Sequence, residues 1–328
     1  MVKMAQYGTK HGHAAGVLSV MLASVDVEVA GVYEPDLGRR RELETSGVPP
    51  WSDVRWFADP RDFLEDPTVA AVAAEGLNRE SLDHVEQIVE AGKHVFYDKP
   101  AGDDFGRFER IVARAGAKGL LVQMGYMFRY HDGFERIADW TRSGRFGPVF
   151  SVRAHMSTHV SSDQRATIGH HRGGIFYDLA GHMIDQIVWL LGRPDRVTSF
   201  LQRSVSSAGG GADNTVAVFE FAKAIASVDI AAMEPRPSAR RFEVYGTKAS
   251  AIMEPFEPAR AIRLCCEEPF GGFPVGVTNL VIVDRTRYVA SLAAFVKDIH
   301  GKKKPDRSLE HELLVQETLL RATGSLPD

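Results

Sequence analysis

The chain of 328 residues is long enough for two domains of ordinary size, and its 44% hydrophobic and 25% charged residues are typical of globular proteins. Its formal net charge of -4, with no basic stripe along any predicted helix, gives no reason to expect a nucleic-acid partner. No uncharged apolar stretch reaches the length of about 18 residues that a membrane span needs, so no membrane partner is expected either.

The two cysteines, Cys265 and Cys266, are adjacent in the chain. Alternation along a strand would point them to opposite faces, so a disulfide between them is not expected. A chain without a disulfide framework favours a reducing compartment, and the N-terminal segment lacks the pattern of a signal peptide. We therefore expect a cytoplasmic protein. The run Lys302-Lys303-Lys304 precedes a proline and is interpreted as a solvated loop.

The first 125 residues alternate short apolar runs with helical patterns. Strands are expected at residues 2–7, 27–33, 69–74, 94–97 and 120–124, and helices at residues 12–23, 37–46, 80–91 and 105–115. Strands that are apolar on both faces and separated by helices favour a parallel sheet covered on both sides. Residues 1–125 are therefore expected to form a doubly wound α/β domain of the Rossmann type, with ligands at the carboxyl ends of its strands.

Residues 126–328 follow a different pattern. Helices are expected at residues 133–143, 174–191, 287–300 and 309–322, strands at 149–157, 215–221, 225–230, 241–245 and 261–264, and loops around 209–211, 235–237 and 267–274. Strands that mix apolar with polar positions favour a mostly antiparallel sheet with one solvent-exposed face. We expect an α+β domain here, whose C-terminal helices are candidates for packing back on the first domain.

The segment between the first strand and the first helix contains Gly8, Gly12 and Gly16. A strand, a tight turn and a helix start together form an anion site, because backbone N–H groups and the helix dipole face a pyrophosphate. The usual Gly-x-Gly-x-x-Gly spacing is not matched, since Lys10 and His13 occupy the second and third glycine places. The alternative is that these glycines only permit a turn and close helix packing.

Glu34 follows the second expected strand, about 20 residues after the glycine turn. An acidic side chain there can accept hydrogen bonds from a ribose diol and repel a 2′-phosphate, which favours NAD over NADP. Arg39, Arg40 and Arg41 follow and could bind that phosphate, so NADP stays open. The alternative for Glu34 is an ordinary exposed carboxylate.

Lys99 stands at the end of the strand expected at residues 94–97 and is followed by Pro100. Proline restricts the backbone angles of the residue before it, so the direction in which the Lys99 side chain leaves the backbone is restricted as well. At the edge of the sheet where ligands bind, such a lysine can hydrogen-bond to a substrate hydroxyl or exchange a proton with it. A lysine at a loop start is otherwise simply solvated.

Asp178 and His182 are four residues apart on an expected helix and so share one face, with Asp185 three residues further on. A histidine flanked by carboxylates on one helical stripe is suited to general base catalysis. The alternatives are a surface ion pair and a metal site, but the histidine spacing matches no standard metal signature.

Four segments of the chain, in register, resemble the Gfo/Idh/MocA oxidoreductase family, and the resemblance covers essentially the whole chain. They are AGKHV at 91–95 leading to Asp98-Lys99-Pro100, GYMFRY at 125–130, GRFGPV at 144–149, and Gly173-Gly174 through Asp178, His182 and Asp185 to LLG at 190–192. The resemblance implies hydride transfer between NAD(P) and a hydroxyl-bearing carbon of a sugar, cyclitol or related polyol.

The resemblance also implies roles for individual residues. Lys99 matches the catalytic lysine of the family, and Asp178 and His182 match its substrate-binding and acid/base pair. The cofactor-binding residues expected are Gly8, Thr9, His11, Gly12, His13, Glu34, Asn78, Asp98 and Lys99. Arg129, His155, Arg172 and Tyr177 are expected to face the substrate, and no metal ligands are expected. A homodimer or homotetramer, paired through the open face of the second sheet, is expected as well.

Four positions depart from the pattern of the family. Asp98 replaces the usual Glu, Glu75-Gly76 stand where Thr-Pro is frequent, and Ser81 stands where His is frequent. One alternative function is a non-catalytic regulator that senses a dinucleotide or sugar on the same scaffold. Another is a metal-dependent lyase or isomerase that uses His155, Asp178 and His182. The identity of the substrate and the direction of the reaction lie beyond the sequence.

Overall fold

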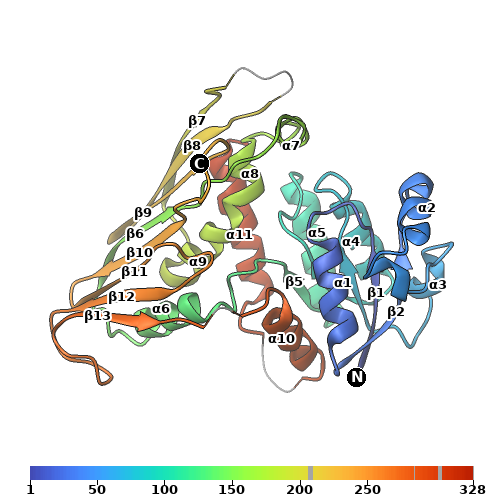
Figure 1. Cartoon of the computed structure of the whole chain (residues 1–328), viewed down its shortest axis with the longest axis horizontal. Helices are drawn as coiled ribbons and strands as arrows, with labels where there is room; N and C mark the ends of the chain where they lie inside the picture. Colours follow the sequence, from blue (N-terminus) through green and yellow to red (C-terminus); the bar gives the residue numbers. More distant parts are fainter. Residues whose placement is uncertain (206–209, 284, 302–304, 328) are drawn as a thin grey trace. The chain divides into compact units, whose positions relative to one another are not determined.

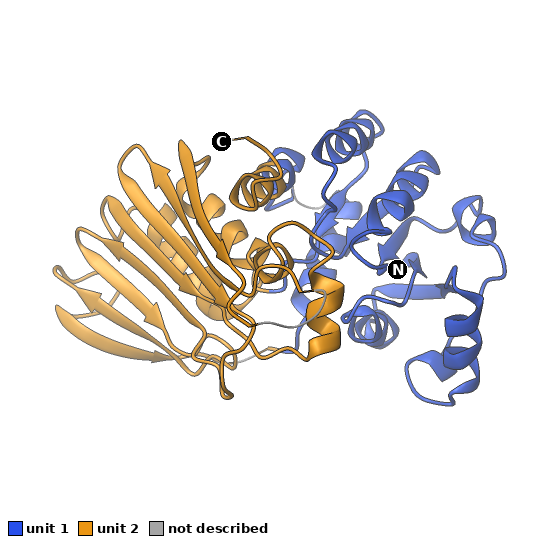
Figure 2. Cartoon of the chain, turned by 90° about the horizontal axis from the view of Figure 1, so that it is seen from above, with its two compact units in different colours: residues 1–127, 286–313 blue, residues 128–285, 314–328 orange. Residues whose placement is uncertain are grey.

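The computed structural model describes residues 1–205, 210–283, 285–301 and 305–327. They form two compact units (Figure 2). Unit 1 contains Met1–Met127 and Thr286–Leu313, and unit 2 contains Phe128–Arg285 and Leu314–Asp328. The chain therefore returns to unit 1 after residue 285 and enters unit 2 again at residue 314. The expected loop at Lys302-Lys303-Lys304 and the first residue of the expected turn at 209–211 lie outside the described residues.

Unit 1 is built on a five-stranded sheet in the order β2-β1-β3-β4-β5. Figure 1 labels β1, β2 and β5 of this sheet. Its strands are β1 (Val2–Tyr7), β2 (Val27–Tyr33), β3 (Ala71–Ala74), β4 (His94–Tyr97) and β5 (Val122–Met124). Each neighbouring pair is parallel, which confirms the expected doubly wound α/β domain. The strand order reverses between β1 and β3, the point at which sheets of this kind bind their ligands.

Helices connect these strands. They are α1 (Ala14–Ala23), α2 (Leu37–Thr45), the short η1 (Trp51–Asp53) and α3 (Arg61–Leu64), then α4 (Ser81–Glu90) and α5 (Phe105–Ala117). Asp36 caps α2 by accepting hydrogen bonds from the N–H groups of Gly38 and Arg39, and Asp104 caps α5 through the N–H of Arg107. Such caps satisfy backbone donors that have no partner within the helix.

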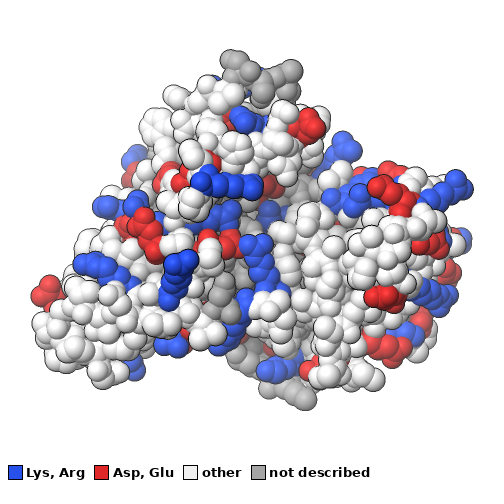
Figure 3. Space-filling view, in the orientation of Figure 1, with Lys and Arg blue, Asp and Glu red and all other residues white. Residues whose placement is uncertain are grey.

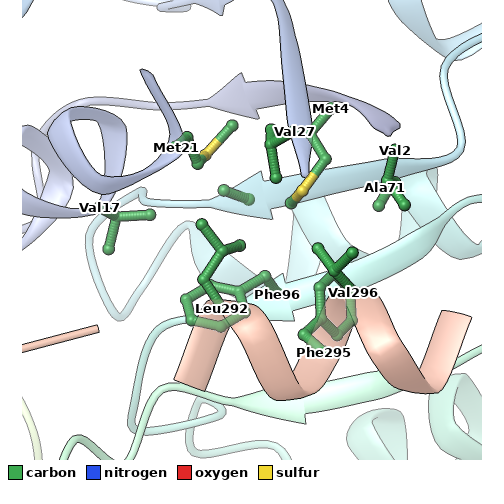
Figure 4. Packing of buried hydrophobic residues seen from close by; sticks show 11 residues of the cluster. Val2, Met4, Val17, Met21, Val27, Ala71, Phe96, Leu292, Phe295 and Val296 are labelled. Carbon is green, nitrogen blue, oxygen red and sulfur yellow. The ribbon is translucent and has the colours of Figure 1, made fainter. Parts of the chain in front are cut away.

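The hydrophobic core of unit 1 joins the sheet to α10 (Val289–Ile299), which is distant in sequence (Figure 4). The buried side chains of this core come from β1, β2, β3, β4, α1 and α10, and include Val2, Met4, Val17, Met21, Phe96, Leu292, Phe295 and Val296. The rings of Phe96 and Phe295 meet edge to face, with centroids 5.6 Å apart. On the other face of the sheet, the Tyr7 ring stacks on His84 of α4 at 4.1 Å. Both faces of the sheet are therefore covered.

Unit 2 contains an eight-stranded sheet in the order β13-β12-β11-β10-β6-β9-β8-β7. Its strands are β6 (Val149–His155), β7 (Arg196–Gln202), β8 (Asn214–Phe221), β9 (Ala224–Ala231), β10 (Arg241–Gly246), β11 (Ala249–Met253), β12 (Ala261–Cys266) and β13 (Gly276–Val281). The pair β6 and β9 is parallel and the other pairs are antiparallel, so the expected mostly antiparallel sheet is confirmed.

One face of this sheet carries the core of unit 2. Ala226, Val228 and Ile230 of β9 alternate as buried residues with more exposed neighbours. Helices α8 (Ile175–Leu179) and α9 (Gly181–Leu191) pack on this sheet, and α6 (Asp132–Arg142) packs on α9. The unit also contains α7 (Ser162–Ile168) and most of α11 (Leu309–Ala322). Large apolar side chains on several strands remain exposed, among them Phe200, Ile225 and Val277.

The single helix expected at residues 174–191 is wrong, because α8 and α9 are separate helices. Ala180 between them keeps right-handed helical angles (φ -64°, ψ -25°). Its carbonyl accepts hydrogen bonds from the N–H groups of both Met183 (3.0 Å) and Ile184 (2.9 Å). This local tightening toward a 3₁₀ turn interrupts the regular α-helical bonding while the chain keeps its helical course.

Positive and negative side chains lie side by side over the face shown in Figure 3, in keeping with the small net charge. Among the described residues, no helix combines the length and the apolar character that crossing a bilayer requires. Cys265 and Cys266 of β12 are both free, as expected.

Candidate active site

The loop between β1 and α1 meets the requirements of a pyrophosphate site. Gly8 has a φ of +85°, and a Cβ atom there would lie 2.8 Å from the backbone nitrogen of Gly76, so glycine allows this loop to touch the end of β3. A Cβ atom on Gly12 would meet no atom within 4 Å. No side chain caps α1 at His13, although the N–H of Ala14 donates to the His11 carbonyl at 3.1 Å. The positive end of the helix dipole at this N-terminus favours an anion. The loop therefore fits a dinucleotide.

Glu34, expected at the ribose, lies beneath this loop with a side chain that is almost fully buried. One of its carboxylate oxygens accepts hydrogen bonds from the backbone N–H (2.8 Å) and the hydroxyl (2.7 Å) of Thr9, and the other from the N–H of Asp36 (2.9 Å). Arg39 then donates to the Thr9 hydroxyl at 2.8 Å. Glu34 thus holds the loop in shape, and its contact with a ribose stays a prediction.

Three of the residues expected at the cofactor converge on one point. The Nδ1 atoms of His11 and His13 lie 2.8 Å and 2.9 Å from the same oxygen, Oδ2, of Asp98, which follows β4. The other oxygen of Asp98 accepts the backbone N–H of Lys99 at 2.7 Å. Burial would raise the pKa of Asp98, but the two neighbouring imidazoles outweigh it and hold this pKa well below its usual range.

Glu75, which follows β3, was not among the residues expected to bind the cofactor or the substrate. Its side chain is completely buried, and burial raises its pKa well above the usual value, with a further contribution from the negative charge of Asp98. The signal in the sequence was the departure from Thr-Pro at Glu75-Gly76. Glycine is required at position 76 because a Cβ atom there would lie 2.6 Å from the His84 ring.

Lys99, the expected catalytic lysine, follows β4 directly and is 3% exposed. The peptide bond from Lys99 to Pro100 is cis. Asn78 lies half-buried in the loop after β3, where its carbonyl accepts a hydrogen bond from the Ser81 hydroxyl at 2.7 Å. Because β1, β3 and β4 are neighbours in a parallel sheet, the residues that follow them meet at one edge of unit 1.

In unit 2, the paired glycines before α8 are explained by crowding. Gly173 and Gly174 both have positive φ values, 92° and 53°. A Cβ atom on Gly174 would lie 2.2 Å from the carbonyl oxygen of Ala212. This turn starts α8, which carries Asp178 in a half-buried position near its end.

His182, in the first turn of α9, is 1% exposed, and its ring meets Phe128 edge to face with centroids 5.4 Å apart. Three residues later, Asp185 accepts hydrogen bonds from Nε (3.0 Å) and Nη2 (2.8 Å) of Arg129. Both side chains of this ion pair are buried. Arg129, which was expected at the substrate, therefore forms an ion pair with a residue of α9. Its direct contact with a substrate stays a prediction.

The remaining residues expected at the substrate, His155, Tyr177 and Arg172, lie in unit 2, and their contact with a substrate stays a prediction. His155 lies between two carboxylates, with Nδ1 2.5 Å from Asp229 and Nε2 3.3 Å from Glu234. These contacts raise the pKa of His155, with the hydrogen bond to Asp229 as the largest cause. Tyr177 is buried and stacks on His171 at 4.6 Å, whereas Arg172 is exposed. Among the described residues, the His and Asp side chains close enough to share an ion are those of His11, His13 and Asp98, not His155, Asp178 and His182.

The chain matches two family models along its length. Residues 5–126 match the model described as oxidoreductase family, NAD-binding Rossmann fold, and residues 134–252 match the GFO/IDH/MocA C-terminal domain. The chain is 28% identical over 159 residues to the uncharacterized oxidoreductase YhhX of Escherichia coli, a match that spans 48% of this chain and 46% of that protein. It thus covers about half the length of that relative.

Two further similarities cover more of the chain. The scyllo-inositol 2-dehydrogenase (NAD(+)) of Bacillus subtilis is 25% identical over 228 residues, which is 68% of this chain and 65% of that protein. The crystal structure of GenD2 from gentamicin A biosynthesis, in complex with NAD, has a TM-score of 0.80 at 24% identity, with 100% of this chain and 94% of that chain covered. The second likeness shows a shared fold.

An NAD(P)-binding Rossmann domain in unit 1 and a matching C-terminal domain in unit 2 lead to one assignment: the chain belongs to the Gfo/Idh/MocA family of NAD(P)-dependent oxidoreductases.

Proposed function

We propose that this protein transfers a hydride between the nicotinamide of NAD(P) and a hydroxyl-bearing carbon of a sugar, cyclitol or related polyol. The observation that carries the proposal is the burial of Lys99 at the edge of the sheet where the dinucleotide loop lies. A cyclitol is one candidate substrate, because the Bacillus subtilis relative is named a scyllo-inositol dehydrogenase.

In this proposal, unit 1 holds the dinucleotide. The N-terminus of α1, which no side chain caps, and the uncrowded Gly12 receive the pyrophosphate, and Glu34 keeps the loop in shape through Thr9. Bound NAD(P) would supply the ring carbon that accepts or releases the hydride. The chain itself orients the substrate and moves the proton.

Lys99, Asp178 and His182 act on the same substrate in this proposal. In the oxidation direction, His182 accepts the hydroxyl proton with the assistance of Lys99, while Asp178 holds the substrate and tunes the histidine. The edge-to-face ring of Phe128 and the buried Arg129–Asp185 pair fix the start of α9, so the imidazole has a defined orientation. Preorganisation of this kind reduces the entropy cost of reaching the transition state.

The proposal is tested by reduction of NAD⁺ and NADP⁺ against a panel of polyols, cyclitols and sugar acids. With the active compound, Lys99→Ala is expected to lower kcat by about 10²-fold or more while nucleotide binding is retained. The matched control is Lys93→Met, because Lys93 is a second buried lysine whose amine donates to the Asp66 carbonyl at 2.6 Å, before the start of β4. Its turnover should match that of the unmodified protein.

Two results would count against this function. Failure of both nucleotides to bind or to be reduced would refute it, and binding without reduction across the panel would favour the sensing role. Unchanged turnover in Lys99→Ala would refute only the role given to that lysine.

We further propose that copies of the chain associate through the open face of the eight-stranded sheet, as a homodimer or homotetramer. Exposed apolar side chains such as Phe200, Ile225 and Val277 support this, because large apolar groups gain free energy when another surface covers them. Light scattering coupled to size exclusion tests it, and Ile225→Glu is expected to shift the mass toward that of one chain.

A further inference from the structure

Unit 1 contains a cluster of potential metal-binding side chains, formed by His11, His13 and Asp98. Their candidate ligand atoms, two imidazole nitrogens and one carboxylate oxygen, all lie within 4.8 Å of one another. His11 and His13 are alternate residues of the loop after β1, and Asp98 follows β4, so the backbones of two strand ends hold the group together.

The spacing is close to that of ligands around one metal ion. Tetrahedral zinc sites have bonds of about 2.0–2.2 Å, which places neighbouring ligand atoms about 3.3–3.6 Å apart. The imidazole nitrogens lie 2.8 Å and 2.9 Å from Oδ2 of Asp98, and the second nitrogen lies 3.2 Å from Oδ1. An opening of about half an ångström, within reach of side-chain rotation, would therefore make room for an ion.

Glu75 provides a second and independent observation. Its side chain is 0% exposed, and neither of its carboxyl oxygens has a hydrogen-bond partner among the described residues. One of these oxygens lies 4.0 Å from Nδ1 of His11. A buried carboxyl without a partner costs free energy, and a cation held by the neighbouring group would remove that cost.

Solvent can reach the cluster of His11, His13 and Asp98, so an ion could enter it from solution. The side chains of His11 and His13 are 11% and 20% exposed, whereas that of Asp98 is 5% exposed. The imidazoles therefore lie at the mouth of the group, and the carboxylates of Asp98 and Glu75 lie at its base. The nearby amine of Lys10 is directed elsewhere, toward Glu80 at 3.1 Å and Asp36 at 3.5 Å.

We propose that His11, His13 and Asp98 bind a divalent transition-metal ion of the zinc class. Glu75 completes the set as the fourth ligand. Two imidazoles with two carboxylates favour zinc, cobalt or nickel over calcium and magnesium, which prefer oxygen ligands throughout. The site does not depend on the proposed activity. Two of its ligands, His11 and His13, come from the loop expected to face the dinucleotide.

The site is tested by titrating the tag-free full-length protein, stripped with chelator and free of nucleotide, with Zn²⁺ in a calorimeter and with Co²⁺ in an absorption spectrometer. We expect one ion per chain and the intense d–d bands of tetrahedral cobalt. His11→Gln and His13→Gln are each expected to weaken binding by at least about tenfold, since even loss of an outer partner of a metal ligand costs about that much.

The matched control is His155→Gln, which also removes an imidazole that contacts two carboxylates but lies in unit 2. Its metal binding should equal that of the unmodified protein. The proposal is overturned if no ion binds, if both loop variants bind as tightly as the unmodified protein, or if His155→Gln loses binding to the same extent.

X-ray absorption of the zinc-loaded unmodified protein tests the ligands even if a loop variant fails to fold. The expected result is two imidazole nitrogens and two oxygens at about 2.0–2.2 Å. A shell that contains sulfur, or one with a single imidazole, would contradict the assignment.

Discussion

The buried ion pair between Arg129 and Asp185 leads to the strongest stability prediction for unit 2. Asp185→Asn keeps the size of the side chain but removes the carboxylate charge that contacts the guanidinium of Arg129, which is itself 1% exposed. Removing one partner of a buried pair costs about 3–5 kcal/mol, because the remaining charge stays buried without compensation. That loss corresponds to a rise of roughly 10²- to 10⁴-fold in the opening equilibrium of the surrounding structure.

Hydrogen exchange read by mass spectrometry on peptides from α9 measures this opening in unit 2 without assuming that both units unfold together. The control is Glu220→Gln, which removes the same charge from an exposed pair with Arg196 (2.5 Å) and should cost no more than about 1 kcal/mol. Arg129→Met combined with Asp185→Leu should recover most of the loss, because apolar replacements leave no charge buried. A loss below about 1 kcal/mol in Asp185→Asn, or a double variant no better than the single one, would refute the reasoning.

Two further predictions concern other parts of the chain. The pKa of His155 should exceed the unperturbed value of about 6.5 in an NMR titration, and Asp229→Asn should lower it, since the hydrogen bond to Asp229 is the main cause of the shift. The protonated imidazole of His155 then stabilises unit 2 below about pH 6.5, and this contribution is lost as the pH rises through the pKa of His155 in the folded protein. Equal pKa values of His155 in the unmodified protein and in Asp229→Asn would contradict this prediction. Phe295→Ala should destabilise unit 1 by about 3–5 kcal/mol in denaturant unfolding, because this fully buried ring packs on Phe96 in the core, and a loss below about 1 kcal/mol would show that α10 is not part of that core.

The strands of unit 1 could be predicted closely from the sequence. Strands β2 and β4 begin and end at the expected residues, because short apolar runs there are bounded by polar residues, glycine or proline. The position of Lys99 directly after β4 follows from the same local pattern. Strands β7, β11 and β13 and helices α3 and α7 were not expected. The two helices span only 4 and 7 residues, too few to show a helical period, and β7 and β13 are the edge strands of their sheet.

The partners of the candidate site residues could not be predicted. His155 contacts Asp229 because β6 and β9 pair in parallel with these two residues opposite one another, and that register joins positions 74 residues apart. Glu34 was expected either to bind a ribose or to be an ordinary exposed carboxylate, and the structure shows it buried beneath the glycine loop. Periodicity indicates which face of an element a residue occupies, whereas the charge it meets there depends on tertiary contacts.

The central claim is that a hydride moves from a hydroxyl-bearing carbon to the nicotinamide. The most direct measurement uses a substrate from the active panel that carries deuterium on the carbon bearing the hydroxyl, with the reduced nucleotide analysed by mass spectrometry. We predict that the deuterium is found on the nicotinamide of the unmodified protein's product, and that Lys99→Ala slows its appearance by about 10²-fold or more. Deuterium released into water, with none on the nicotinamide, would contradict the account.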